Sequence, residues 1–166
     1  EEIFDNIWIQ PAAGDAGGAL GGAYSVYYQE YDNERVINLD KMDKMQGAFL
    51  GPKFSDKEIK KYLDSVNAKY EYINNEDNLT DIVSGEIANE KVVGWHYDRM
   101  EFGPRSLGHR SIVGDARSQK MQSTMNLKIK YRESFRPFAP SILIEKASDW
   151  FELNVESPYM LLVSPV

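Results

Sequence analysis

The sequence has no cysteine, two histidines and no long apolar run. Without cysteine the chain has neither a disulfide framework nor a thiolate metal site, which is compatible with the reducing cytoplasm that we expect as its compartment. No apolar run approaches the roughly 20 residues needed to cross a bilayer, and the N-terminus lacks the basic and apolar regions of a signal peptide. These absences predict a soluble protein with no membrane partner.

Positive charge is scarce outside one segment. The 166 residues include 19 Lys and Arg against 26 Asp and Glu, which gives a net charge of -7. Residues 99–136 hold six Arg, three Lys and three acidic residues, or +6, so the rest of the chain carries -13. This acidic remainder repels polyanions, which argues against nucleic acid as a partner. The basic segment itself, interrupted by Gly and Pro, is typical of a local anion site.

The length and apolar content suit one packed domain. The chain begins at Glu1 without an initiator Met and ends on the apolar segment SPYMLLVSPV. We therefore expect an excerpt from a longer polypeptide.

The N-terminal part predicts a strand, a segment of small residues and a helix. Ile3–Gln10 alternates weakly in polarity and runs into Pro11, as a short buried strand does. The following PAAGDAGGALGGAY contains a single charge, Asp15, and its small residues allow the backbone to approach a ligand closely. Residues 19–28 are predicted to be helical, and a domain boundary is predicted within residues 31–45.

The remainder alternates helices with strands, which is an α/β pattern. Ser55 and Glu58 match a capping box that opens a helix running to about residue 68. Met121 and Met125 are expected to face inward from a later helix. Apolar spacing predicts further helices at residues 79–87, 119–129 and 146–153, and buried strands at residues 91–97 and 141–145.

Arg99, Arg105 and Arg110 follow the predicted strand at residues 91–97, on a loop that contains Gly and Pro. Ligands of α/β sheets lie outside the carboxyl ends of strands. Guanidinium groups bind phosphate or carboxylate oxygens through paired donors. Ser111 either caps a turn or binds a phosphate beside Arg110.

A second set of polar side chains, most of them basic, recurs at mixed spacing within residues 126–136. The segment RPFAP, which starts at Arg136, contains two prolines that stiffen the backbone and so predetermine the direction of that side chain. The alternative is that the basic residues are solvated surface charges paired with Glu101, Asp115 and Glu133. The set consists of Asn126, Lys128, Lys130, Arg132 and Arg136.

The segments RMEFGPRSLGHRSIVGDAR and NLKIKYRESFRPFAPSIL resemble the signature of the O-carbamoyltransferase family, which includes nodulation-type and antibiotic-tailoring enzymes. PAAGDAGGALGGAY and LGPKFSDKEI are also similar, so the resemblance covers nearly the whole chain. Family members are similar to a fusion of an N-terminal actin-like domain, which binds a metal, and a C-terminal YrdC-like domain. The implied fold is α/β, a YrdC-like twisted open sheet with flanking helices, preceded by a terminal strand-helix piece of an actin-like domain.

By this resemblance, residues 1–35 are the C-terminal piece of the actin-like domain, and residues 36–166 are a truncated YrdC-like domain that docks on the missing actin-like part. The YrdC-like part of the family joins ATP, with Mg²⁺, and carbamoyl phosphate into carbamoyl-adenylate. The carbamoyl group then passes to the hydroxyl of a small-molecule acceptor. Asp15 matches a ligand of a transition metal such as iron, whose other ligands lie outside this chain.

The resemblance and the charge pattern together suggest a role for each candidate residue. Arg105, Arg110 and Arg136 are the catalytic candidates, because charge builds up on phosphoryl oxygens during adenylation. The expected ligands of ATP and carbamoyl phosphate are Arg99, Ser111, Asn126, Lys128, Lys130 and Arg132.

The chain departs from the usual family pattern GRMEFGPRALGNRS at Asp98, Ser106 and His109, where the pattern has Gly, Ala and Asn. A carboxylate at position 98 either weakens nucleotide binding or pairs with Arg99. His109 is expected in a loop, and His96 is expected to be packed or hydrogen-bonded in the core.

Two other functions stay open. The YrdC-like fold also occurs in proteins that act on RNA, so the chain could be an RNA- or nucleotide-binding module without transferase activity. The signal for RNA is weaker, because the aromatic residues of the basic segment are not arranged as an evident exposed stacking series. These residues are Phe102, Tyr131, Phe135 and Phe138. The chain could also be only a docking scaffold.

Overall fold

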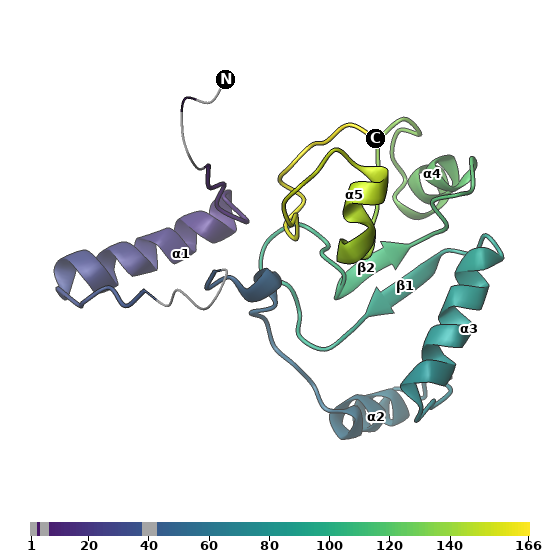
Figure 1. Ribbon diagram of the computed structural model, residues 1–166. Helices are drawn as coiled ribbons and strands as arrows, with labels where there is room; N and C mark the ends of the chain where they lie inside the picture. The colour runs from purple at the N-terminus through teal and green to yellow at the C-terminus, as the bar shows by residue number, and fades with distance from the viewer. Residues whose placement is uncertain (1–2, 4–6, 38–42) are drawn as a thin grey trace. The chain divides into compact units, whose positions relative to one another are not determined.

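The computed structural model of the chain describes residues 3, 7–37 and 43–166. The chain divides into two compact units, each built from segments that are far apart in the sequence (Figure 1). Unit 1 comprises Glu1–Pro52, Arg99–Leu107 and Ile144–Val166, and unit 2 comprises Lys53–Asp98 and Gly108–Leu143. The predicted domain boundary between residues 35 and 36 refers to a longer protein and stays a prediction. Part of the boundary segment, residues 38–42, lies outside the described residues.

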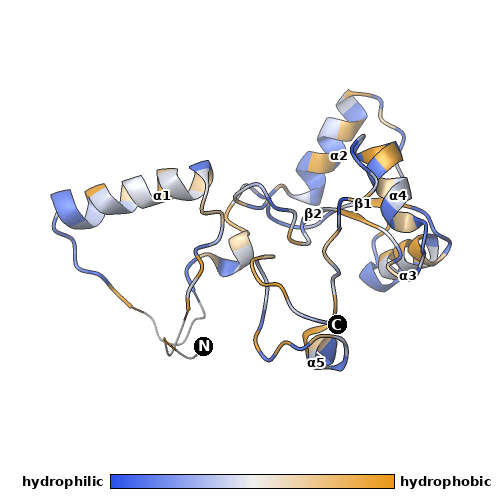
Figure 2. Ribbon diagram, turned by 90° about the horizontal axis from the view of Figure 1, so that it is seen from above, coloured by the Kyte–Doolittle hydropathy of each residue, from blue (hydrophilic) through white to orange (hydrophobic). Residues whose placement is uncertain are grey.

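The small-residue segment of unit 1 forms the predicted helix. α1 spans Asp15–Ser25 and continues into a π-helix, η1, at Val26–Glu30. Gly17 N donates to Ala12 O at 2.8 Å, and a Cβ on Gly17 would lie 2.3 Å from that oxygen, so the helix start requires glycine. α1 buries none of its residues and is mostly pale in Figure 2, the colour of intermediate hydropathy.

The strand predicted at residues 3–10 is wrong where the structure describes it. Residues 4–6 lie outside the described residues, and residues 7–10 have no regular structure. Ile7 and Trp8 are both largely exposed. A strand is stable only when a neighbouring strand takes up its hydrogen bonds, and the described sheet lies elsewhere in the chain.

A tight left-handed turn organises unit 1. In η2, the 3₁₀ turn Gln46–Ala48, the three φ angles are 51°, 74° and 66°. Left-handed backbone costs roughly 1–2 kcal/mol for each non-glycine residue, so the turn needs outside support. The Asp43 carboxylate accepts from Met45 N at 2.6 Å. The Tyr159 hydroxyl donates to Asp43 at 2.8 Å and accepts from Gly47 N at 3.0 Å.

The core of unit 1 is built around this turn. Burial, followed by the hydrogen bond to Asp43, raises the pKa of the Tyr159 hydroxyl above its usual value. The hydroxyl is therefore held in its protonated, donating form. Met45, Ala48 and Tyr159 are buried, and the partly buried residues packed against them are Leu20, Phe102, Leu107 and Leu161.

The strand predicted at residues 141–145 is also wrong. Residues 141–143 have no regular structure, and they lead into a 3₁₀ turn, η4, at Ile144–Lys146. The described residues offer this segment no partner strand, because β1 and β2 pair only with each other. The helix predicted next is confirmed in shorter form as α5, at Ala147–Trp150.

The first two helices of unit 2 start at side-chain caps. α2 (Asp56–Ser65) opens with the predicted capping box, in which the Glu58 carboxylate accepts from Ser55 N at 2.8 Å. α3 (Glu76–Ala88) starts after Asn75, whose Oδ1 accepts from Asn78 N at 2.9 Å. Both predicted helices are confirmed, since polar N-caps and one apolar stripe are local signals.

Within the described residues, the sheet of unit 2 has two antiparallel strands, β1 (Val93–His96) and β2 (Arg110–Val113). β1 confirms the strand predicted at residues 91–97, and α3 lies beside it in Figure 1. His96 stands opposite Arg110 and is exposed, so the prediction of a packed His96 is wrong. β2 places Arg110 at the start of a strand, where the sequence indicated a loop.

The helix predicted at residues 119–129 is confirmed as α4 (Met121–Thr124) followed by a π-helix, η3 (Met125–Ile129). Met121 and Met125 are each 5% exposed and face inward as expected. Gly114 packs against them, since a Cβ at Gly114 would lie 2.7 Å from Met121 Sδ. The two methionines thus anchor η3 and the residues that follow it.

The described structure is a mixture of helices and one small sheet, in agreement with the α/β expectation. Within its described range, the chain contains no helix that is both long enough and apolar enough to cross a membrane.

We expect Tyr159→Phe to lower the free energy of unfolding of the full-length protein by about 1–3 kcal/mol at pH 7, because the change leaves Asp43 and Gly47 N without their partner. Urea denaturation followed by tryptophan fluorescence measures the loss. Because the folded-state pKa of Tyr159 is raised, the stabilisation is complete below about pH 10 and declines above it. Tyr72→Phe, at an exposed tyrosine, is the control. Equal stabilities of wild type and Tyr159→Phe at pH 7 would contradict the role given to the hydroxyl.

Candidate functional site

The loop at residues 130–136, called here the pinned loop, is held by one buried amide. Asn126 is 0% exposed, and its Nδ2 donates to the carbonyl oxygens of Ser134 and Arg136 at 3.1 and 2.8 Å. Its Oδ1 accepts from Arg132 Nε at 2.6 Å, and its backbone oxygen accepts from Arg132 N at 3.0 Å. Asn126 is inaccessible to a ligand in this conformation. The structure therefore gives it a positioning role, where the sequence predicted a direct ligand contact.

A second side chain secures the far end of the pinned loop. Gln122 Nε2 donates to the carbonyl oxygens of Phe135 and Arg136 at 3.2 and 3.1 Å. The Arg132 guanidinium lies 4.8 Å from the centre of the Phe138 ring, a cation–π contact that further limits its movement. The pinned loop is thus fixed from two positions of the preceding helical segment.

Some charged side chains of the pinned loop and of the residues just before it have ion-pair partners, and others have none. Arg136 Nε pairs with Glu133 at 2.8 Å, and both side chains are about half exposed, so the pair adds little stability. Lys128 and Lys130 are exposed, and neither ammonium group has a hydrogen bond or ion pair with any described residue. These two lysines therefore offer unpaired positive charge on a fixed backbone.

Ser111 lies on β2 with its hydroxyl in a local turn. Its Oγ accepts from Gly108 N at 3.0 Å, and Gly108 has a φ of 112° that favours glycine. This bond matches the turn-capping alternative. The hydroxyl proton has no acceptor among the described residues, so a role as a phosphate donor stays a prediction.

Arg117, the remaining arginine of the basic segment, is an ordinary surface ion pair. Its Nε and Nη2 donate to the Asp115 carboxylate at 2.9 and 2.8 Å. These hydrogen bonds from Arg117 lower the pKa of Asp115 to about 2. Arg117 thus satisfies its charge locally.

In unit 1, residues 101–107 form a loop that closes on the left-handed turn. Phe102 N donates to Ala48 O at 2.7 Å, and the buried Glu101 carboxylate accepts from Leu107 N at 2.6 Å. Gly103 has a φ of 99°, and a Cβ on it would lie 2.6 Å from Ala12 Cβ. A larger residue at position 103 would therefore push the loop away from the start of α1.

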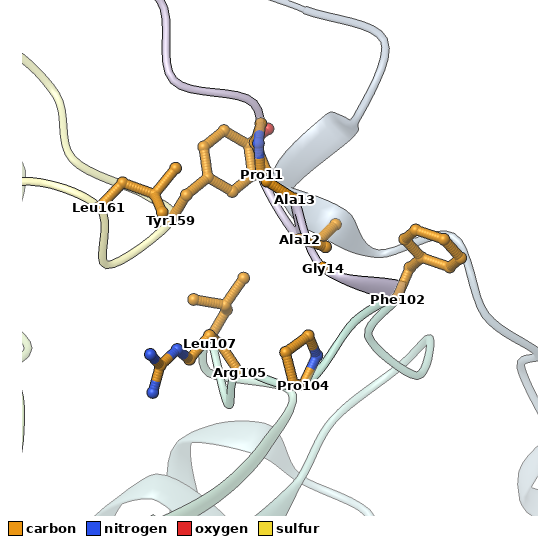
Figure 3. Close-up of a pocket in the computed structure, with 11 residues that line it drawn as sticks. Pro11, Ala12, Ala13, Gly14, Phe102, Pro104, Arg105, Leu107, Tyr159 and Leu161 are labelled. Atoms are coloured by element: carbon orange, nitrogen blue, oxygen red, sulfur yellow. The ribbon is translucent and has the colours of Figure 1, made fainter. Parts of the chain in front are cut away.

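This loop borders a small pocket of about 200 Å³ (Figure 3). Most of the lining is apolar and comes from residues 11–14, from the loop itself and from Tyr159 and Leu161. Arg105 is the charged member of the lining, and its guanidinium has no hydrogen bond or ion pair with any described residue. Arg99 differs, because its Nη1 donates to Gly51 O at 3.0 Å.

A family model for the carbamoyltransferase C-terminus matches residues 84–166, half of the chain. The chain belongs to the carbamoyltransferase family. The matched range includes β1, β2, the basic segment and the pinned loop. All candidate site residues except Asp15 therefore lie in the part of this carbamoyltransferase chain that the family shares.

The similar curated proteins are much longer than this chain. The Synechocystis protein sll1178 is 59% identical over 168 residues, which cover 100% of this chain and 27% of that protein. Nodulation protein NolNO of Sinorhizobium fredii is 39% identical over 99% of the chain and 24% of its own length. Nodulation protein NolO of Bradyrhizobium diazoefficiens is 36% identical over 91% and 26%. The chain spans about a quarter of the length of these relatives.

Asp98 is the position at which the sequence resemblance leads us to expect glycine. Its φ is 52°, in the left-handed region that glycine adopts freely and that Asp tolerates better than most residues. The Asp98 carboxylate forms an ion pair with Lys53. The backbone conformation at position 98 thus suits glycine, and Lys53 provides the Asp98 carboxylate with a partner.

Asp15 forms no metal site with the residues that the structure describes. It lies exposed in the first turn of α1, and the described residues contain no group of three His, Cys, Asp or Glu side chains that could hold a metal. One carboxylate is too few ligands for a transition metal. The role predicted for Asp15 therefore requires ligands from beyond the described residues.

The sequence analysis missed Gln122 and the positioning role of Asn126. A signal was present, because the two residues are four apart and share a face when the segment is helical. Nothing local in the sequence shows that this face meets the backbone of residues 134–136, since that contact depends on how the loop folds back.

We expect Asn126→Ala to loosen the pinned loop and to lower the free energy of unfolding by about 1–3 kcal/mol, because two backbone carbonyls and Arg132 lose their partner. Limited trypsin digestion of the full-length protein should cleave faster after Lys130 and Arg132.

Asn126→Asp keeps an acceptor for Arg132 but removes both donors, so we expect an intermediate cleavage rate. Asn33→Ala, at an exposed asparagine of unit 1, serves as the control. Wild-type cleavage rates in Asn126→Ala would show that the amide does not hold the loop.

Proposed function

We propose that the full-length protein is an ATP-dependent O-carbamoyltransferase and that this chain carries the part that makes carbamoyl-adenylate. The observation that supports the proposal most is the coincidence of the family match, residues 84–166, with the basic segment and the pinned loop. A family named for carbamoyl transfer needs a region that binds anionic donors, and this region concentrates the positive charge of an otherwise acidic chain.

The proposed reaction has three steps. Water hydrolyses carbamoyl phosphate, breaking the bond to the phosphoryl group and leaving carbamate and inorganic phosphate. A carbamate oxygen then attacks the α-phosphorus of ATP and expels pyrophosphate, which gives carbamoyl-adenylate. Finally the hydroxyl oxygen of the acceptor attacks the carbamoyl carbon, AMP leaves, and the hydroxyl proton passes to solvent.

The cations of the chain would serve the first two steps. Charge accumulates on phosphoryl oxygens in both, so groups already aimed at those oxygens lower the barrier. Arg105, Arg110 and Arg136 take the catalytic roles in this proposal. The groups that bind ATP and carbamoyl phosphate are Arg99, Ser111, Lys128, Lys130 and Arg132, with Asn126 holding the pinned loop in place.

Mg²⁺ would enter with ATP, coordinated mainly by phosphate oxygens rather than by a protein cage. Residues 36–166 are proposed to be a YrdC-like domain and residues 1–35 the end of an actin-like domain. This division is supported by α1, which buries none of its residues although Leu20 packs against the core of unit 1, and so leaves surface that could pack against another part of the protein. Asp15 would there contribute one ligand to a transition metal, with the acceptor site in the same missing part.

The central test is pyrophosphate release by the full-length protein incubated with ATP, Mg²⁺ and carbamoyl phosphate. We expect release that requires carbamoyl phosphate and falls on the order of 100-fold in Arg105→Ala, the loss typical when a donor that stabilises developing charge is removed. Arg105→Ala with Arg110→Ala should fall at least as far.

Arg117→Ala is the matched control, since Arg117 is an exposed arginine of the same segment that pairs with Asp115. It should release pyrophosphate at the wild-type rate. The proposal fails if the folded, metal-loaded protein releases none, or if the double variant retains the wild-type rate.

A further inference from the structure

Two aromatic rings of the pinned loop project into solvent. Tyr131 is 85% exposed and Phe135 is 77% exposed. An exposed aromatic ring forgoes the stabilisation that burying its apolar surface would give. Single exposed rings are common on surfaces, but these two sit on backbone that the structure holds in place.

The backbone at Tyr131 is fixed in an unfavourable conformation. Its φ is 49°, in the left-handed region, which is unfavourable for a residue that has a Cβ. The neighbouring amides hold it there, since Lys130 N donates to Met125 O at 2.9 Å and Arg132 N donates to Asn126 O at 3.0 Å. The Tyr131 ring therefore has a backbone that is set before any ligand arrives.

Unpaired cations stand next to this ring in the sequence. Lys130 precedes Tyr131 and Lys128 lies two residues earlier, and neither ammonium group has a partner among the described residues. The acidic residue of the pinned loop, Glu133, is paired with Arg136. An exposed aromatic residue that neighbours lysines with unpaired ammonium groups in the sequence suits a ligand that combines a planar ring with an anion.

We propose that Tyr131 is a stacking platform for the base of a nucleoside triphosphate whose phosphates are bound by Lys130 and Lys128. The identity of that nucleotide as ATP rests on the proposed function. Bases stack on aromatic side chains whatever their hydrogen-bonding edge, so the platform adds affinity for the nucleoside rather than for the phosphates. A long polyanion is disfavoured by the charge of -13 outside the basic segment, which points to a mononucleotide rather than RNA.

The test compares two ligands that share a phosphate chain and differ in the nucleoside. Isothermal titration of the full-length protein with ATP and with inorganic tripolyphosphate, in the same buffer and salt, separates stacking from charge. We expect Tyr131→Ala to bind ATP roughly tenfold more weakly than wild type and to bind tripolyphosphate with the wild-type affinity. Tyr131→Trp should bind ATP at least as tightly as wild type. Lys130→Ala should weaken both ligands.

Tyr72→Ala is the control, because Tyr72 is an exposed tyrosine of the same unit that follows Glu71 rather than a lysine. Equal losses for ATP and tripolyphosphate in Tyr131→Ala, or no loss for either, would overturn the proposal. So would tight binding of mixed-sequence RNA that depends on Tyr131 in a protein that does not bind ATP. If wild type releases pyrophosphate and Tyr131→Ala binds ATP with unchanged affinity, the stacking role of Tyr131 is refuted. The proposed transferase function would then still stand.

Discussion

The buried amide of Asn126 is the constraint on which the pinned loop depends. An amide without access to water must find its hydrogen-bond partners within the protein, and here the partners are two carbonyl groups and the guanidinium of the loop itself. Satisfying one buried side chain therefore fixes an irregular backbone together with the charged groups that it carries. An irregular segment that is held in this way can present cations without losing backbone entropy when a ligand binds.

Unit 1 uses the same principle at a different place. The left-handed turn at residues 46–48 is unfavourable by itself, and the carboxylate of Asp43 with the hydroxyl of Tyr159 provides the hydrogen bonds that it needs. The turn then accepts the amide of Phe102, which places the loop that carries Arg105. In both units an irregular segment bearing an arginine is positioned by a buried polar side chain rather than by regular secondary structure.

Local signals in the sequence predicted the helices well and the strands poorly. The capping box at Ser55 and Glu58 and the inward methionines depend on residues a few positions apart, and the structure confirms them. The strands predicted at residues 3–10 and 141–145 depended on partners that the sequence cannot specify. The charge of the pinned loop was evident in the sequence. The role of Asn126 and the exposure of Tyr131 were not, because they depend on how the loop folds back on the preceding helical segment, which no sequence pattern predicts. The family resemblance is confirmed because long motifs carry it, whereas the functions of individual arginines stay predictions.

The proposed function depends on a cationic loop that is ordered before its ligand binds. Hydrogen exchange of the full-length protein, followed by mass spectrometry of peptides that cover residues 126–136, tests this most directly. We expect slow exchange at the Arg132 amide without substrates, and little further change when ATP and carbamoyl phosphate are added, because the bond to Asn126 O is already present. Exchange at the rate of an unstructured chain, with protection only after the substrates are added, would contradict it.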